Sequence, residues 1–265
     1  MLRLLFTRRW LGYLALTVVF AVVASLFGLW QWDRRGQAVA AMDLVANNFD
    51  RAPVELEPLL MAEGILGGEY EWVPVVLEGT YRPEDQVLVR TRPREGSVGF
   101  EVLVPFDTGS LSVIVNRGWI STGESQDFPD SVPVAPTGIV RLVGHLRPSE
   151  PLLPGRGAPE GQIASIYLPR LNADSSLELR EDVYVALGSE TPSPGLAPLG
   201  VARPVLDEGP HLSYTFQWYL FAVMAFGGLW YMLRQEARVH SGVVPVRKPT
   251  RDEDEEDALL DREAR

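Results

Sequence analysis

The chain of 265 residues contains no cysteine, a single lysine (Lys248) and only three histidines. The absence of cysteine excludes disulfide scaffolds, thiolate metal sites, iron–sulfur clusters and a cysteine nucleophile. Positive charge is also scarce: the chain has 24 lysine and arginine residues against 35 aspartate and glutamate residues, which gives a net charge of −11. A general nucleic-acid-binding protein needs a basic face, so we expect no nucleic acid among its partners.

Two long runs of the sequence carry no charged residue. Residues 10–29 and 214–233 are each long enough, as helix, to cover the roughly 30 Å hydrocarbon core of a bilayer. The first run exceeds the apolar part of a signal peptide, and Trp30-Gln31-Trp32 follows it where a cleavage site would place small residues. The pattern therefore predicts two transmembrane helices, with Trp and Tyr at their ends as interfacial anchors.

The distribution of basic residues predicts the orientation of these helices. Basic residues stand just before the first run and just after the second, at Arg3, Arg8, Arg9, Arg234, Arg238, Arg247 and Lys248. The segment between the runs is acidic overall, so the positive-inside rule places both termini in the cytoplasm. We expect residues 1–9 to form a cytoplasmic N-terminus and residues 10–32 to form the first helix. Residues 33–213 are then an extracytoplasmic domain and residues 214–233 the second helix. Residues 234–265 are a tail that is first basic, then acidic and disordered.

The segment between the two runs has the pattern of one β-rich domain. Apolar residues at Ala38, Met42 and Val45 extend the first helix to a stop at Asn47-Asn48. Seven short β-branched runs follow, punctuated by turns and proline-rich loops, at 73–81, 86–90, 99–105, 111–115, 138–146, 162–168 and 182–187. We predict an α+β domain whose sheet is mainly antiparallel and curls into a barrel or sandwich, because an open edge invites aggregation.

Asp107-Thr-Gly-Ser110 is similar to the local sequence of an aspartic protease. That chemistry needs two carboxylates that share a proton, so a second copy of the chain would have to supply the other one. The same residues lie between two predicted strands, which favours a hairpin turn. A membrane-anchored aspartic-type hydrolase remains a minor alternative.

His211 stands just before the second apolar run and is followed by Tyr214, Gln217 and Trp218. In a helix that begins near residue 211, we expect these four side chains to share one face. Gln217 would then be a polar group inside the membrane, where such residues face a partner helix or a ligand. The spacing allows a metal or haem ligand at His211, and the alternative is an interfacial histidine with a glutamine bonded to the first helix.

Several motifs, in this order along the chain, resemble the surfeit locus protein one family of cytochrome c oxidase assembly factors. The most specific are Val115-Asn-Arg-Gly-Trp119 and His211-Leu-Ser-Tyr214 with Gln217-Trp218-Tyr219. The other matching segments are Arg9-Trp10, Gly28-Leu-Trp-Gln-Trp32 with Arg34-Arg35, Gly79-Thr-Tyr81, Val87-Leu-Val-Arg90, Gly99-Phe100 with Pro105, and Gly144-His-Leu-Arg147. The chain departs from the family in its acidic tail and at Tyr167-Leu-Pro-Arg170, where an aromatic Pro-Trp segment is expected.

The resemblance implies a non-enzymatic membrane factor that matures the haem-a-bearing catalytic subunit of a terminal oxidase. Its implied partners are that subunit, the oxidase complex, the haem a synthase and the lipid bilayer, and its implied cargo is haem a. When the roles of the family's residues are transferred to the matching positions, His211 becomes the haem iron ligand. The residues expected around the haem are Tyr214, Gln217, Trp218, Trp30, Trp32 and Arg117. Arg117 also has a simpler interpretation, as an arginine that satisfies carbonyl groups at a turn. A stable accessory subunit of the oxidase is the alternative function.

Overall fold

The computed structural model describes residues 5–240, so the predictions for residues 1–4 and for the acidic tail lie outside the described residues. The chain divides into two compact units. One unit contains the residues up to Gln37 together with those from Glu208 onward, and the other contains Ala38–Asp207.

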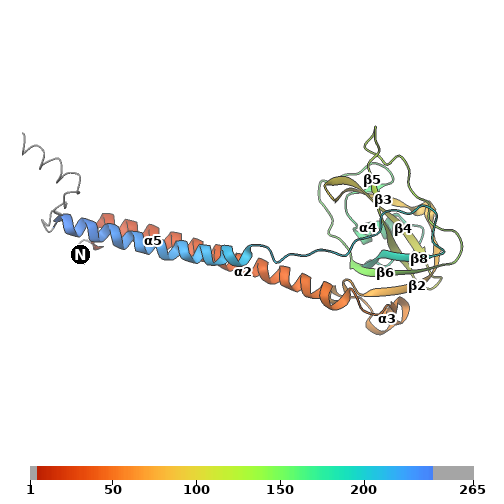
Figure 1. Ribbon diagram of the computed structural model, residues 1–265, viewed down its shortest axis with the longest axis horizontal. Helices are drawn as coiled ribbons and strands as arrows, with labels where there is room; N and C mark the ends of the chain where they lie inside the picture. The colour runs from red at the N-terminus through yellow and green to blue at the C-terminus, as the bar shows by residue number, and fades with distance from the viewer. Residues whose placement is uncertain (1–4, 241–265) are drawn as a thin grey trace, which may run out of the picture. The chain divides into compact units, whose positions relative to one another are not determined.

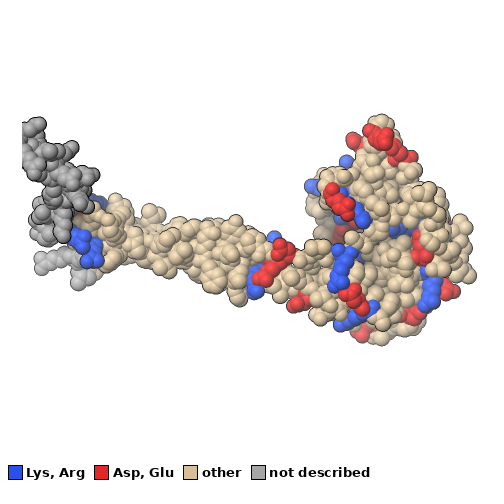
Figure 2. All heavy atoms as spheres, in the orientation of Figure 1, with Lys and Arg blue, Asp and Glu red and all other residues tan. Residues whose placement is uncertain are grey.

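Two long helices, α2 (Arg8–Asn48) and α5 (His211–His240), correspond to the two uncharged runs. Both are long and apolar enough to cross a membrane by length and composition. On the face shown in Figure 2, the middle of the helix pair carries no charged side chain. Helix α2 runs without interruption to Asn48, which confirms the predicted stop, and the buried Asn48 amide donates hydrogen bonds to the carbonyls of Glu69 and Glu71 at 2.9 and 2.8 Å.

Within the first unit α2 and α5 lie side by side and antiparallel (Figure 1). Their buried and half-buried residues recur in steps of four and three, a 3.5-residue repeat typical of helices that coil around each other. The repeat comprises Trp10, Leu14, Thr17, Ala21, Ala24, Gly28, Gln31 and Arg35 on α2, and His211, Thr215, Trp218, Ala222, Ala225, Leu229 and Leu233 on α5. Small residues in the middle of this seam let the two backbones approach closely.

The second unit is built on one eight-stranded sheet with the strand order β1-β2-β6-β8-β5-β4-β3-β7. The strands are β1 (Val54–Glu55), β2 (Pro74–Tyr81), β3 (Val87–Arg94), β4 (Ser97–Asp107), β5 (Ser112–Ser121), β6 (Val140–Pro148), β7 (Gln162–Ile163) and β8 (Val183–Thr191). Short helices α3 (Leu56–Glu63) and α4 (Leu168–Asp174) and the 3-10 turns η1 (Gly68–Tyr70) and η2 (Pro83–Asp85) complete it. Each predicted strand has a counterpart, but β1, α3 and α4 were not predicted.

The sheet closes on itself, because β2 pairs with β4 as well as with β6. The closed ring therefore runs β2-β6-β8-β5-β4, which is the strand order of the five-stranded Greek-key barrel known as the OB fold. A barrel was one of the two predicted forms of the sheet.

The sheet is mainly antiparallel, as predicted, but not purely so, because β1–β2, β3–β7 and β5–β8 pair in parallel and make it a mixed sheet. The long connection that contains β6 and β7 lets β8 return beside β5 in the same direction. The predicted strand 162–168 is also shorter, because α4 begins at Leu168 with a proline in its first turn, a favourable position for proline.

Alternation along the barrel strands builds two apolar cores. On β4, Val102, Val104 and Phe106 point into the main core, whereas Leu103 joins a second cluster on the outer face. Residues from the β6–β8 connection cover that outer face: Ile163, Ile166, Leu168, Leu171 and Leu179. The inner face of the barrel sheet therefore packs around the main core, and the β6–β8 connection covers part of the outer face.

The Asn116-Arg-Gly-Trp119 motif forms a β-bulge inside β5 and not a turn at its end. The register passes from Val102↔Gly118 to Leu103↔Asn116, so Arg117 has no partner on β4. Gly118 has φ +127°, and a Cβ atom there would lie 2.3 Å from the carbonyl oxygen of Leu199. Only glycine fits both the backbone conformation and this close approach.

We expect Gly118→Ala to destabilise the barrel by about 2–4 kcal/mol, because backbone strain and a steric clash add together. Gly96→Ala is the matched control: Gly96 also has positive φ (+83°), but a Cβ atom there meets no other atom within 4 Å. The Gly96→Ala substitution should lower the free energy of unfolding by only about 1 kcal/mol. Thermal unfolding of the detergent-solubilised chain by near-ultraviolet circular dichroism measures both, and equal losses would contradict the bulge argument.

Candidate functional site at the His211 end of the helix pair

His211 begins α5 and lies half-buried in the seam with α2. Its Nδ1 atom is 2.8 Å from Oε1 of Gln31, and its carbonyl accepts a hydrogen bond from the Thr215 hydroxyl at 2.9 Å. An amide oxygen can only accept a hydrogen bond, so Nδ1–H is the donor in this contact, and in the neutral ring Nε2 then carries the lone pair. The Gln31 side chain therefore orients the imidazole ring of His211 and leaves Nε2 on the side of the ring away from this contact.

An ion pair and an aromatic stack flank this hydrogen bond. On one side Arg35 forms a salt bridge with Glu208, and its guanidinium lies 5.6 Å from the centre of the Trp32 ring. On the other side Phe27 and Trp218 stack, with ring centres 4.8 Å apart and planes 24° apart. Three layers therefore follow one another along this end of the helix pair: the charged pair Arg35–Glu208, the polar pair Gln31–His211 and the aromatic pair Phe27–Trp218.

The approach of the two helices is close just beyond this stack. A Cβ atom on Gly28 would lie 3.0 Å from Cε2 of Tyr219, so a larger residue would force the ring to move. The contact between Gly28 and Tyr219 therefore sets the helix spacing at which Gln31 reaches His211.

The structure brings together only some of the predicted site residues. His211 and Trp218 share the seam, whereas Trp30, Trp32 and Tyr214 are 52, 55 and 45% exposed on the outside of the helices. These three rings are accessible from the surroundings of the helix pair and not from the seam.

The expectation that Gln217 shares the face of His211 is wrong, because Gln217 is exposed and directed away from α2. At about 100° per residue, position 217 lies roughly 120° around the helix from position 211. Gln31 takes the role of polar partner in its place. The sequence signal for it was available, because Gln31 continues the repeat of Ala24 and Gly28 on α2.

Arg117 belongs to the barrel unit, where its side chain is fully buried. Its guanidinium donates hydrogen bonds to Glu190 at 2.9 Å and to the carbonyl of Pro133 at 3.0 Å, and it lies 5.4 Å from the Tyr81 ring centre. Tyr81 donates to the same carboxylate at 2.7 Å, and burial together with this bond raises the pKa of Tyr81. A haem-binding role for Arg117 stays a prediction that would require this ion pair to open.

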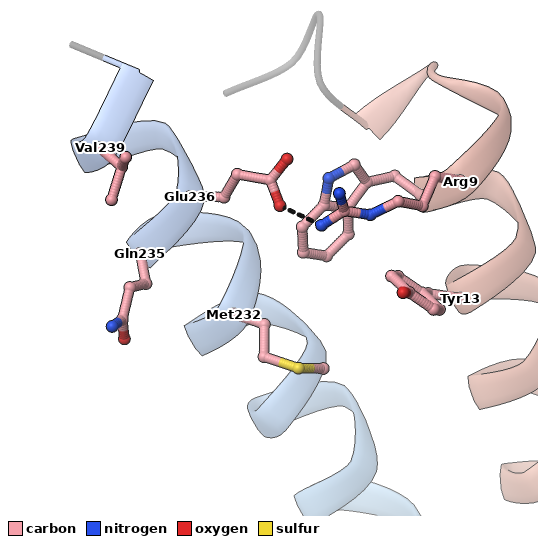
Figure 3. Close-up of a pocket in the computed structure, with 7 residues that line it drawn as sticks. Arg9, Tyr13, Met232, Gln235, Glu236 and Val239 are labelled. Atoms are coloured by element: carbon pink, nitrogen blue, oxygen red, sulfur yellow. Dashed lines mark hydrogen bonds and ion pairs between the residues drawn. The ribbon is translucent and has the colours of Figure 1, made fainter.

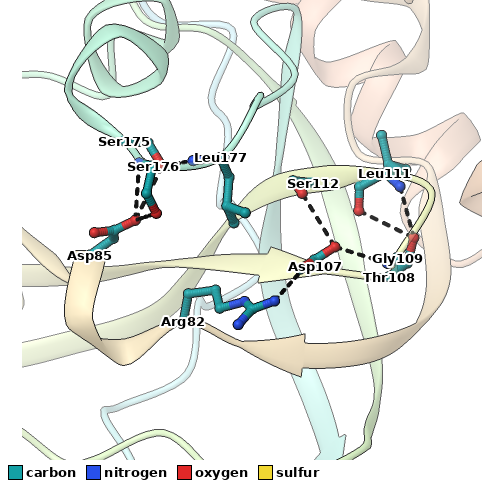
Figure 4. Close-up of polar contacts among 10 residues, drawn as sticks. All are labelled: Arg82, Asp85, Asp107, Thr108, Gly109, Leu111, Ser112, Ser175, Ser176 and Leu177. Atoms are coloured by element: carbon teal, nitrogen blue, oxygen red, sulfur yellow. Dashed lines mark hydrogen bonds and ion pairs between the residues drawn. The ribbon is translucent and has the colours of Figure 1, made fainter.

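Asp107 lies in a hairpin turn between β4 and β5 (Figure 4). Its carboxylate accepts hydrogen bonds from the Arg82 guanidinium at 2.7 Å and from the Gly109 amide at 2.8 Å. The Arg82 hydrogen bond, followed by that of Gly109, lowers the pKa of Asp107. A proton-sharing aspartic dyad needs a neighbouring carboxylate that raises one pKa, so this geometry is that of a turn.

The opposite end of the helix pair contains a pocket of about 640 Å³ (Figure 3). Arg9 and Glu236 form a salt bridge of 2.6 Å across it, and Tyr13, Met232, Gln235 and Val239 also line it. Because Arg9 is largely exposed, this pair contributes little to stability.

Within residues 5–240, no group of three or more His, Asp or Glu side chains is placed to hold a metal ion.

The fold and the site define a class of protein: a small barrel inserted in the sequence between two paired apolar helices, with a histidine at the end of the pair. Residues 18–223 match the SURF1 family. The chain is 32% identical over 250 residues to the uncharacterized SURF1-like proteins Rv2235 of Mycobacterium tuberculosis and Mb2259 of Mycobacterium bovis, covering 91% of this chain and 90% of each relative. The chain belongs to the SURF1 family.

The seam makes a testable prediction, because the native chain has no cysteine that would compete with introduced ones. We expect Gln31→Cys with His211→Cys to be joined by a short thiol crosslinker, since these side chains meet across the seam. Leu29→Cys with His211→Cys is the control, because Leu29 is 57% exposed on the far side of α2. After proteolysis of the barrel segment, the first variant should keep its two helices joined on a gel, and equal joining in both variants would contradict the seam.

Proposed function

We propose that this protein is a membrane assembly factor for the haem-a-containing terminal cytochrome c oxidase. In this proposal it is not an enzyme. It receives haem a as cargo from the haem a synthase and helps its insertion into the catalytic subunit. The family membership supports the oxidase as the target, and the His211–Gln31 hydrogen bond is the observation that supports a haem-binding site.

The proposed topology has α2 and α5 crossing the plasma membrane of a bacterium, with both termini in the cytoplasm and the barrel outside. Their uncharged lengths and the basic residues at their other ends support it. His211 then lies at the outer end of a span, where the propionates of haem a can reach water while its farnesyl tail stays in the bilayer.

The residues at this end fit an amphiphilic haem. His211 would hold the haem iron through Nε2, and Gln31, 2.8 Å from Nδ1, would orient the imidazole ring for that bond. The exposed rings of Trp30, Trp32 and Tyr214 provide apolar surface for a porphyrin on the lipid side of the helices. Arg34 is exposed one turn after Trp30 on α2, and its hydrogen bond to the uncharged Gln37 amide, at 3.0 Å, could yield to a propionate, whereas Arg35 is already paired with the charged Glu208.

Loss of the protein is expected to lower the amount of assembled oxidase that contains haem a, while synthesis of the apo-subunit continues. A deletion strain without a paralogue, examined by difference spectra of its membranes and immunoblots of the subunit, measures both quantities. Normal oxidase spectra and activity would overturn the proposal. Stoichiometric co-purification with the mature oxidase, with normal haem content in the deletion strain, would instead favour the accessory-subunit alternative.

His211→Ala is expected to abolish the Soret shift of haem a in protein purified from cells that also make the haem a synthase. Gln31→Ala should keep the ligand but weaken affinity by about tenfold, because it removes the group that orients the ring. His145→Ala and His240→Ala are the matched controls: His145 stacks on Phe49 in the barrel unit, and His240 bonds a carbonyl at the other end of α5. If His211→Ala left the Soret position and affinity unchanged, apolar walls and arginines would hold the haem without ligation.

A further inference from the structure

The barrel unit contains a pocket of about 530 Å³ on the outer face of β4 and β5. Pro105 of β4 and Ile114 of β5 form part of its base. The connection between β2 and β4 lies on one side, and the connection between β6 and β8 lies on the other. In OB barrels this same face, between these same two connections, is where oligonucleotides and oligosaccharides bind, both of which are extended chains. We call this feature the β4–β5 pocket.

The walls of the β4–β5 pocket combine an apolar floor with an acidic rim. The floor residues are Val87, Pro105, Ile114, Ile163, Leu171 and Leu179. The rim carries four carboxylates, from Glu84, Asp85, Glu160 and Asp174. The one basic residue of the lining, Arg170, lies 3.6 Å from Asp174 and so offsets only one of these charges.

The two lips of the pocket are tied together in advance. Asp85, in the β2–β4 connection, accepts hydrogen bonds from the Ser176 hydroxyl at 2.8 Å and from the Ser175 hydroxyl at 3.3 Å, both in the β6–β8 connection (Figure 4). The outer face beside the pocket is covered by Ile166 and Leu168. A ligand therefore meets a preformed cleft, which lowers the entropic cost of binding.

The chemistry of the lining restricts the class of ligand. Four carboxylates repel nucleic acids and other polyanions. The lining residues include no aromatic side chain, and stacking on aromatic rings is what OB barrels use to hold bases. A polypeptide with cationic and aliphatic side chains matches both the rim and the floor.

We propose that the β4–β5 pocket docks an extended segment of a partner protein, with basic side chains against the rim and one aliphatic side chain on the floor. We infer a basic segment because the rim of the pocket is acidic. We infer an extended segment because the pocket lies on the face where OB barrels bind extended ligands. The site does not involve His211 and holds whether or not haem a is the cargo.

The test uses the full chain in detergent and fluorescein-labelled pentapeptides, with fluorescence anisotropy as the readout. The basic apolar peptide Leu-Arg-Val-Arg-Leu should bind, whereas Leu-Glu-Val-Glu-Leu and Ser-Arg-Ser-Arg-Ser should bind at least about tenfold more weakly. Glu84→Arg with Glu160→Arg should weaken binding of the basic apolar peptide by about tenfold, because attraction at the rim becomes repulsion. Both positions are exposed, so the fold should tolerate the changes.

Glu124→Arg with Asp127→Arg is the matched control, because it makes the same change in net charge at exposed positions outside the pocket. It should change the affinity by less than about twofold, since salt screens distant charges. Equal weakening in both double variants would overturn the proposal in favour of general charge attraction. Equal binding of the serine peptide would overturn the role of the apolar floor, and no binding of the basic apolar peptide would overturn the site.

Discussion

The close contact between α2 and α5 is the constraint on which the candidate site depends. Small residues such as Ala24 and Ala222 in the seam permit this contact, and Gly28 beneath the Tyr219 ring leaves no room for a larger side chain. At this spacing Gln31 reaches the imidazole of His211 from a position 180 residues earlier in the chain. The polar pair is therefore a product of helix packing, and it would be lost if the helices separated by even one side-chain layer.

The barrel depends on a different kind of interaction, which is a charge held in its interior. Arg117 is placed there by the bulge that Gly118 allows, and Glu190 neutralises it from the neighbouring strand β8. Removing one member of such a buried pair costs about 3–5 kcal/mol, because the remaining charge has no water to solvate it. The Asn-Arg-Gly-Trp motif thus identifies the family through a structural requirement of the barrel, and a sequence motif of this strength need not mark a ligand site.

Much of the fold could be predicted from the sequence, because its signals are local. Uncharged length defined the helices, an asparagine pair defined the end of α2, and short β-branched runs between turns located the strands. The parallel return of β8 beside β5 could not be predicted, since it depends on pairing between distant segments. At the site, His211 was recognised by its motif, but its expected neighbour Gln217 faces away. Counting positions by three and four from Gly28, rather than along α5 alone, is the reasoning that finds Gln31.

The separation of the two helices in the chain has a consequence for biosynthesis. His211 is made 180 residues after Gln31, which at about 5–20 residues per second takes roughly ten to forty seconds. In the proposed topology, the nascent α2 enters the bilayer without its partner, and the Gln31 amide must bond to water at the membrane surface during that interval. Gln31 lies at the end of the uncharged run and not in its middle, so its amide can reach water and costs little free energy while it has no protein partner. The barrel likewise stays open until β8 has been synthesised, so the unfinished segment needs protection from misfolding before its last strand is made.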